Sequence, residues 1–341
     1  MTLMLGDPGR QRWVRGAIAA GIVVLALAGG FLFRYLRIGH QVDRKRTDAA
    51  SLLKRGNYGD FIAAANKYDE IVRSKRDKTH AWRARVYINA AIPFEFGNVN
   101  SQATGNVDSL DAKSSEEAAA IAIYRSFARG ELDGSLRLAE ELGERFPKSA
   151  LLHYLHGRAL LLKGRNEQAE NELARATLLD KEHALYHRYL GDARLARGDE
   201  ERAEAAYTAA LKINPRHIGT QLARAHLLIR RNEVDAAQGL LDQILTGSLR
   251  ALASRGQRGW AHALQAQPLA LRGEQIQAAV DRARGSAPVQ DPTFADTLAD
   301  ALVRVFALGA AGQMAARSEK TMTGRPHPML IKARVFLSQG R

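Results

Sequence analysis

The feature that most constrains the fold is a repeat with a period of 34 residues. Shifting the sequence by that period superposes three glycines and three alanines: Gly130, Gly164 and Gly198, then Ala169, Ala203 and Ala237. Repeats of this length are typical of helix pairs that bury their apolar faces against neighbouring pairs. We therefore expect an all-α chain that forms an α-solenoid of antiparallel helix pairs, rather than one compact globule.

The composition agrees with helices and narrows the chemistry. The chain of 341 residues is 46% hydrophobic but only 6% aromatic, and it has 9 prolines, which suits close-packed helices better than sheets. It has no cysteine, so disulfides, thiolate metal sites and cysteine nucleophiles are excluded. Its net charge of +14 favours acidic proteins, anionic lipids or nucleic acid as partners without choosing among them.

Residues 184–217 carry the fullest copy of the repeat. Its marked positions are Leu190 and Gly191 in a first helix, Ala203, Tyr207 and Ala210 in a second, and Pro215 at the end. Small side chains allow two helices to cross closely, a large ring fills the space beside them, and proline cannot continue a helix. This unit resembles the tetratricopeptide repeat family, and the resemblance implies a right-handed superhelix.

The rest of the chain divides around this unit. Residues 114–251 are predicted to hold the central repeats, and residues 41–92 to form N-terminal helices of the same type. Residues 93–113 are rich in Asn, Ser, Gly and Asp and lack periodicity, so they are expected to be a loop insertion. Residues 252–341 are expected to form degenerate repeat-like helices that end in a capping helix.

The N-terminus is predicted to be a short basic tail, residues 1–15, followed by a transmembrane helix, residues 16–36. Residues 16–33 carry no charge and would span about 27 Å as a helix, close to the thickness of a hydrocarbon core. A cleaved secretory signal is the alternative, with Ala26-Leu27-Ala28 as the cleavage site. Apolar residues continue beyond that site, which favours a retained anchor.

A retained anchor implies a single-pass protein of the plasma (inner) membrane. Arginines on both sides of the apolar stretch leave the side of the repeats open, and the signal-like layout favours the extracytoplasmic (periplasmic) side. Small residues spaced four apart in the stretch also leave a homodimer through the span possible.

We find no motif for catalysis. Phosphate-binding glycine loops and the GxSxG elbow are absent from the sequence. His183 and His187 share a helical face but lack a third ligand nearby. The chain is therefore expected to be neither an enzyme nor a binder of a metal or cofactor.

The family resemblance implies that the first helix of each pair lines a concave surface, through the second, fifth, ninth and twelfth residues of the repeat. These positions hold Leu151, Tyr154, Arg158 and Leu161, then Leu185, Arg188, Asp192 and Leu195, then Leu222, His226 and Ile229. Tyr154 would anchor a partner, and Arg158 and Arg188 would bind carboxylates of an acidic segment. The alternative is contact through the convex side or through residues 93–113.

Two functions follow. The first is a membrane-tethered scaffold that binds a peptide or helix of a partner protein and assembles a cell-envelope complex. The alternative is a basic adaptor that binds anionic lipid or nucleic acid through Arg255, Arg258, Arg282 and Arg284. Nucleic acid is disfavoured, because this basic segment has few aromatic rings for stacking on bases, Trp260 among them.

Overall fold

The computed structural model describes residues 8–74, 77–97, 110–271, 281, 299, 302–303, 308–321 and 326–338. Within these residues it contains helices and no strands, which confirms the all-α prediction. The helices are α1 Pro8–Arg55, α2 Tyr58–Arg73, α3 Lys78–Phe96, α4 Glu116–Ala128, α5 Leu132–Arg145, α6 Ala150–Leu162, α7 Asn166–Leu179, α8 Ala184–Ala196, α9 Glu200–Ile213, α10 Ile218–Arg230, α11 Val234–Leu245, the 3₁₀ turn η1 Arg250–Leu252, α12 Arg255–Leu271, α15 Leu308–Thr321 and α16 Pro326–Ser338.

The 34-residue period corresponds to antiparallel helix pairs, as predicted. The pairs are α4 with α5, α6 with α7, α8 with α9 and α10 with α11. The turn inside a pair needs a left-handed residue, and Gly130, Gly164 and Gly198 supply it with φ of 74°, 78° and 85°. In the fourth pair Asn232 has φ 60° at the equivalent place, which asparagine tolerates better than most residues.

Close helix crossing inside the pairs depends on a second glycine. A Cβ atom on Gly191 would lie 2.4 Å from Cε1 of Tyr207, and one on Gly157 would lie 2.6 Å from Cγ of Leu173. Both distances are far below van der Waals contact, so only glycine fits without movement of a neighbour. The predicted roles of Gly191 and Tyr207 are therefore confirmed.

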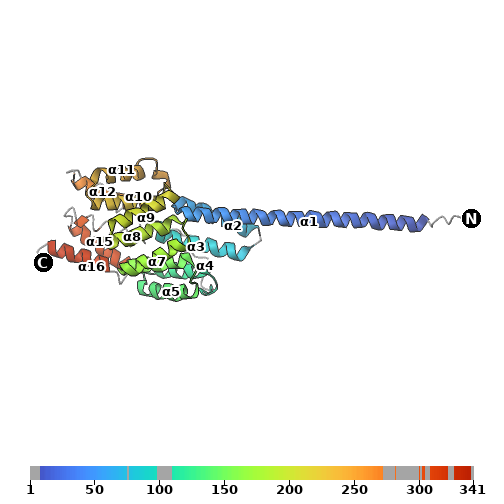
Figure 1. Cartoon of the computed structure of the whole chain (residues 1–341), viewed down its shortest axis with the longest axis horizontal. Helices are drawn as coiled ribbons and strands as arrows, with labels where there is room; N and C mark the ends of the chain where they lie inside the picture. Colours follow the sequence, from blue (N-terminus) through green and yellow to red (C-terminus); the bar gives the residue numbers. More distant parts are fainter. Residues whose placement is uncertain are drawn as a thin grey trace, which may run out of the picture.

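α1 is one unbroken helix of 48 residues. Its apolar half projects away from the other helices (Figure 1), and large side chains from Ile22 to Leu36 are 51–75% exposed. Its other half begins the packed array, with Val42 5% and Ala49 0% exposed. The helix continues through the boundary that we expected between residues 36 and 41, so no loop separates the apolar segment from the repeats.

The sequence predicted that residues 93–96 belong to a loop. In the structure they form the last turn of α3. Pro93 lies inside that helix, and Phe94, Glu95 and Phe96 are buried. Proline removes one helical hydrogen bond, but burial of two phenylalanines more than offsets that cost. The remainder of the predicted insertion from 98 to 109 lies outside the described residues, and Leu110–Ser115 lead into α4.

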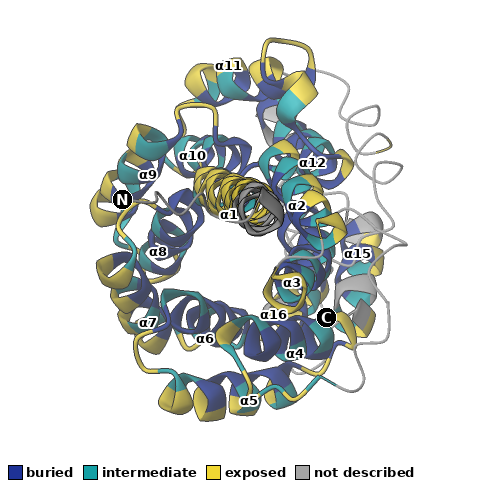
Figure 2. Ribbon diagram, turned by 90° about the vertical axis from the view of Figure 1, so that its right-hand side faces the viewer, coloured by how far each residue is buried: buried dark blue, intermediate teal, exposed yellow. Residues whose placement is uncertain are grey.

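The array closes on itself, and Figure 2 shows the resulting ring of helices. At one contact, Asn57 Nδ2 donates to the Arg216 carbonyl at 3.0 Å, and the Ile218 amide donates to Asn57 Oδ1 at 3.0 Å. At a second, the Ser254 hydroxyl donates to the Phe96 carbonyl at 2.6 Å. The N-terminal helices α1, α2 and α3 therefore pack against turns that lie about 160 residues later in the chain.

The C-terminal segment contains helices where the sequence predicted them. α15 packs against α16, and Ile331 and Val335 of α16 are buried against Met314 of α15. The stretch between α12 and α15 lies largely outside the described residues.

Candidate functional site

The predicted inner-face residues of α6 meet a carboxylate from the same chain. Tyr124 of α4 and Tyr154 of α6 donate their hydroxyls to Glu95 Oε1, each at 2.7 Å. Arg158 donates through Nη1 to Glu95 Oε2 at 2.7 Å. The Tyr189 hydroxyl of α8 lies 3.4 Å from the same oxygen. The end of α3 thus lies across the inner faces of three successive helix pairs.

This Glu95 cluster is buried and charged. The side chains of Arg158 and Glu95 are 3% and 1% exposed, and the guanidinium lies 3.7 Å from the ring centroid of Tyr189 and 4.5 Å from that of Phe94. Burial alone would lower the pKa of Arg158, but the Glu95 carboxylate and the surrounding phenol oxygens raise it well above its usual value. Burial raises the pKa of Tyr154 and Tyr124 well above 10, so both phenols are neutral donors.

In the next repeat the predicted residues pair with each other. Arg188 Nη2 lies 3.0 Å from Asp192 Oδ2, and the Tyr207 hydroxyl donates to Asp192 Oδ1 at 2.9 Å. The Arg188 guanidinium also lies 5.3 Å from the ring centroid of Trp260 on α12. Arg188 Nε and Trp260 Nε1 are buried and have no acceptor among the described residues. This region, which we call the Arg188 cluster, therefore contains two buried donors that lack an acceptor among the described residues.

The remaining predicted residues divide between core and surface. Leu195 and Leu222 are 6% and 0% exposed and belong to the cores between helix pairs, whereas Leu161 and His226 are half-buried. Glu95 is the important residue that sequence reasoning missed. The only available signal was the Phe-Glu-Phe order of residues 94–96, which places a carboxylate between two apolar side chains.

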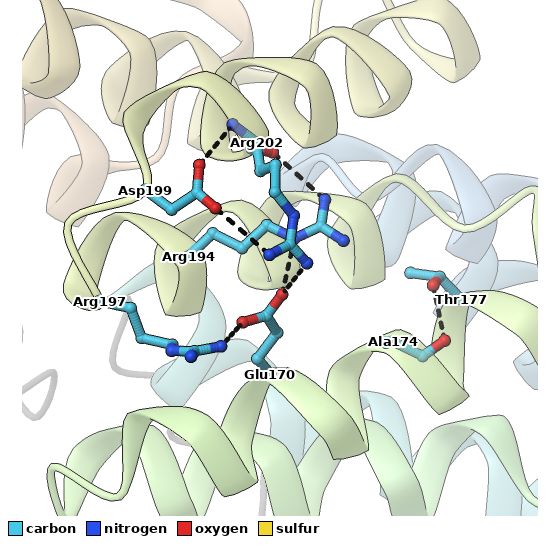
Figure 3. Close-up of polar contacts among 7 residues, drawn as sticks. All are labelled: Glu170, Ala174, Thr177, Arg194, Arg197, Asp199 and Arg202. Atoms are coloured by element: carbon cyan, nitrogen blue, oxygen red, sulfur yellow. Dashed lines mark hydrogen bonds and ion pairs between the residues drawn. The ribbon is translucent and has the colours of Figure 1, made fainter.

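The outer layer has a different cluster of charges, which Figure 3 shows around Glu170 of α7. Glu170 Oε1 lies 3.1 Å from Arg194 Nε and 2.6 Å from Arg202 Nη2, and Arg197 bonds to Oε2. Burial raises the pKa of Glu170, but hydrogen bonds from Arg197 and Arg194 and the nearby positive charges lower it overall. These three arginines come from the next helix pair, so the cluster joins two repeats.

The described residues offer little support for metal binding or for the predicted lipid and nucleic-acid site. Among the described residues no group of three His, Cys, Asp or Glu side chains could hold a metal ion. Of the arginines proposed for lipid or nucleic acid, Arg255 is exposed, and Arg258 is half-buried and donates to the Ala253 carbonyl at 2.5 Å. Arg282 and Arg284 lie outside the described residues.

The fold and the inner face define a closed α-solenoid of helical hairpins. Residues 126–192 and 194–246 match the sequence profile of the tetratricopeptide repeat. The chain is a tetratricopeptide-repeat protein. No protein of curated function has a significantly similar sequence.

Solved structures show the same fold at low sequence identity. The chain is similar to a chain of the APC/C hetero-tetramer Cut9-Hcn1, with a TM-score of 0.55, 10% identity and 84% of this chain covered. It spans 54% of that chain. It is also similar to the human IFIT1 dimer with PPP-AAAA, with a TM-score of 0.50 and 11% identity, covering 83% of this chain and 69% of that one. At these identities the similarity concerns the fold alone.

Proposed function

We propose that the chain is a membrane-tethered scaffold that binds another protein and helps to assemble a complex at the cell envelope. The observation that carries this proposal is the continuity of α1, whose exposed apolar half and repeat half, packed through Val42 and Ala49, form one helix. A continuous run of exposed Ile, Val, Leu and Phe side chains is unfavourable in water and marks a membrane or protein contact. The repeat fold supplies an extended surface for a partner.

The apolar half of α1 has the length and composition of a membrane span. Among the described residues, the part Gly21–Arg55 of α1 is long and apolar enough to cross a membrane. Its most apolar window has a mean hydropathy of 1.7, and none of that window is buried. A signal sequence near the N-terminus would meet the same criteria. Extraction of native membranes with alkaline carbonate and the mass of the mature chain separate the two: a tether stays in the pellet at full length, whereas a cleaved chain is released without its first 28 residues.

We further propose that an acidic segment of the partner binds the inner face at the Arg188 cluster. Tyr154 and Arg158 already hold Glu95 beneath α3, so we place the partner at the part of the predicted face around Arg188, Asp192 and His226, of which Asp192 and His226 are half-buried. The buried donors Arg188 Nε and Trp260 Nε1 would gain an acceptor from an incoming carboxylate.

Site-specific photo-crosslinking in native membranes tests this site. A photo-reactive amino acid replaces half-buried His226, and in a control chain it replaces exposed Thr208 on α9. The proposal expects position 226 to crosslink a partner peptide rich in Asp and Glu, and the Trp260→Phe substitution to weaken that crosslink. Crosslinks from position 208 alone would refute the inner-face site and favour the convex side.

A further inference from the structure

The C-terminal end of α2 and the N-terminal end of α3 lie closer to the apolar half of α1 than the repeats do, because α2 runs back along α1 toward the apolar end (Figure 1). We call these two helix ends the α2–α3 turn and define it by Arg73, Ser74, Asp77 and Lys78. Ion pairs fix the register: Lys67 Nζ lies 3.0 Å from Asp48 Oδ2, Lys45 Nζ lies 2.7 Å from Glu70 Oε2, and Arg46 bonds to Asp77 at the start of α3. The turn is therefore level with Arg46 of α1.

Exposed cations surround this turn and the α1 segment before it. We define the basic collar as Arg34, Arg37 and Arg44 of α1 with Arg73 and Lys78 at the turn, all exposed. Within the described part of the chain these five side chains form no ion pair with the neighbouring acids, since Glu70, Asp77 and Asp48 pair with Lys45, Arg46 and Lys67. The collar therefore presents a net positive charge on the side that faces the apolar segment, where Asp43 is an exposed acid beside Arg44.

The length of α1 places this charge next to a bilayer. The predicted span ends at Leu36, and ten further residues to Arg46 rise about 15 Å. The head-group layer occupies about 6 Å of that rise. The turn then lies about 9 Å above the lipid head groups, close to the Debye length of about 8 Å at physiological salt. Arg37 would lie at the start of the head-group layer, and Arg34, in the last turn of the predicted span, would reach that layer through its long side chain.

We infer that the basic collar docks on anionic phospholipid head groups and holds the repeat array at a fixed height and tilt on the membrane. This inference rests on the proposed tether. Basic groups near an anionic surface are attracted within about one Debye length, and each Lys or Arg changes the docked population about fivefold. Because α1 has no break before the repeats, docking of the turn would orient the whole ring.

Energy transfer in vesicles tests the inference with the full chain. The sequence has no cysteine, so Thr79→Cys at the exposed start of α3 gives one site for a donor dye. The chain is reconstituted into phosphatidylcholine vesicles with and without phosphatidylglycerol, and the acceptor dye is on the lipid head group. We expect stronger transfer with phosphatidylglycerol and loss of the difference in 0.5 M salt, a concentration that shortens the Debye length to about 4 Å.

Substitutions identify the surface. Arg73→Gln with Lys78→Gln removes two cations at the turn and should reduce the ratio of docked to undocked chains, by at most about 25-fold. Lys148→Gln with Lys212→Gln removes two exposed cations elsewhere and should leave the transfer unchanged. Equal transfer in both lipids, or unchanged transfer in the turn variant, refutes docking. The tether is still supported in that case if alkali does not release the chain from the membrane. Release of the chain by alkali refutes the tether and the docking together.

Discussion

Removing the charge of Glu95 is the most direct test of the closed inner face. Glu95→Gln keeps the size of the side chain and an oxygen acceptor for the phenols of Tyr124 and Tyr154. It leaves the Arg158 guanidinium without the carboxylate that now lies 2.7 Å away. Since both side chains are at most 3% exposed, water cannot replace the lost partner.

The loss of folding stability expected for Glu95→Gln follows from this burial. Breaking a buried ion pair by removing one partner costs about 3–5 kcal/mol, because the other charge stays buried and uncompensated. That is a large part of the 5–15 kcal/mol that typically stabilises a domain. Replacing both partners by apolar residues removes the uncompensated charge, so Glu95→Leu with Arg158→Met should recover part of the lost stability. Recovery stays incomplete because the buried hydroxyls of Tyr124 and Tyr154 lose their acceptor.

Urea unfolding of the full chain in detergent, followed by circular dichroism, measures these values. Glu201→Gln on α9 is the control, because its side chain is exposed and such changes stay within about 0.5 kcal/mol. A loss below about 1 kcal/mol for Glu95→Gln would contradict the buried pair. A double variant as unstable as the sum of the two single variants would contradict a direct interaction between the two side chains.

Three further predictions concern packing, ring closure and pH. Gly191→Ala should destabilise the chain by about 1–3 kcal/mol, because the added methyl would lie 2.4 Å from the Tyr207 ring, and thermal unfolding measures the loss. Asn57→Ala should speed hydrogen exchange of the Ile218 amide, which loses its 3.0 Å acceptor, and unchanged exchange would argue against the closed ring. Burial, and then the charge of Arg188, lowers the pKa of His217 to about 4. The unfolded chain therefore binds a proton on His217 between about pH 6.5 and 4 that the folded chain does not, so this group alone should lower stability by about 3 kcal/mol as pH falls through that window. Buried His183, whose pKa burial lowers to about 3, adds to the fall. Urea unfolding at several pH values checks this, and a His217→Asn variant with the same pH dependence would refute the assignment.

The local part of the fold could be predicted from the sequence, because the period fixes which side chains meet inside each helix pair. Gly191 against Tyr207 and the left-handed turn at Gly198 are contacts of this kind. The Glu95 cluster could not be predicted. Its partners lie 29 to 94 residues away along the chain, and Pro93 in a polar stretch favoured a loop over a helix end. Whether the inner face binds a partner stays a prediction.

Closure of the ring changes how the inner arginines can be studied. In an open solenoid each repeat contacts only its neighbours, so an inner-face residue can be replaced with little effect beyond its own pair. Here Arg158 connects α6 to the end of α3, and Asn57 connects the α1–α2 turn to the start of α10. Loss of binding in an Arg158 variant would therefore report loss of structure as much as loss of contact. The same connections join α1 to the repeats, so movement at the inner face would be transmitted to the helix that we propose spans the membrane.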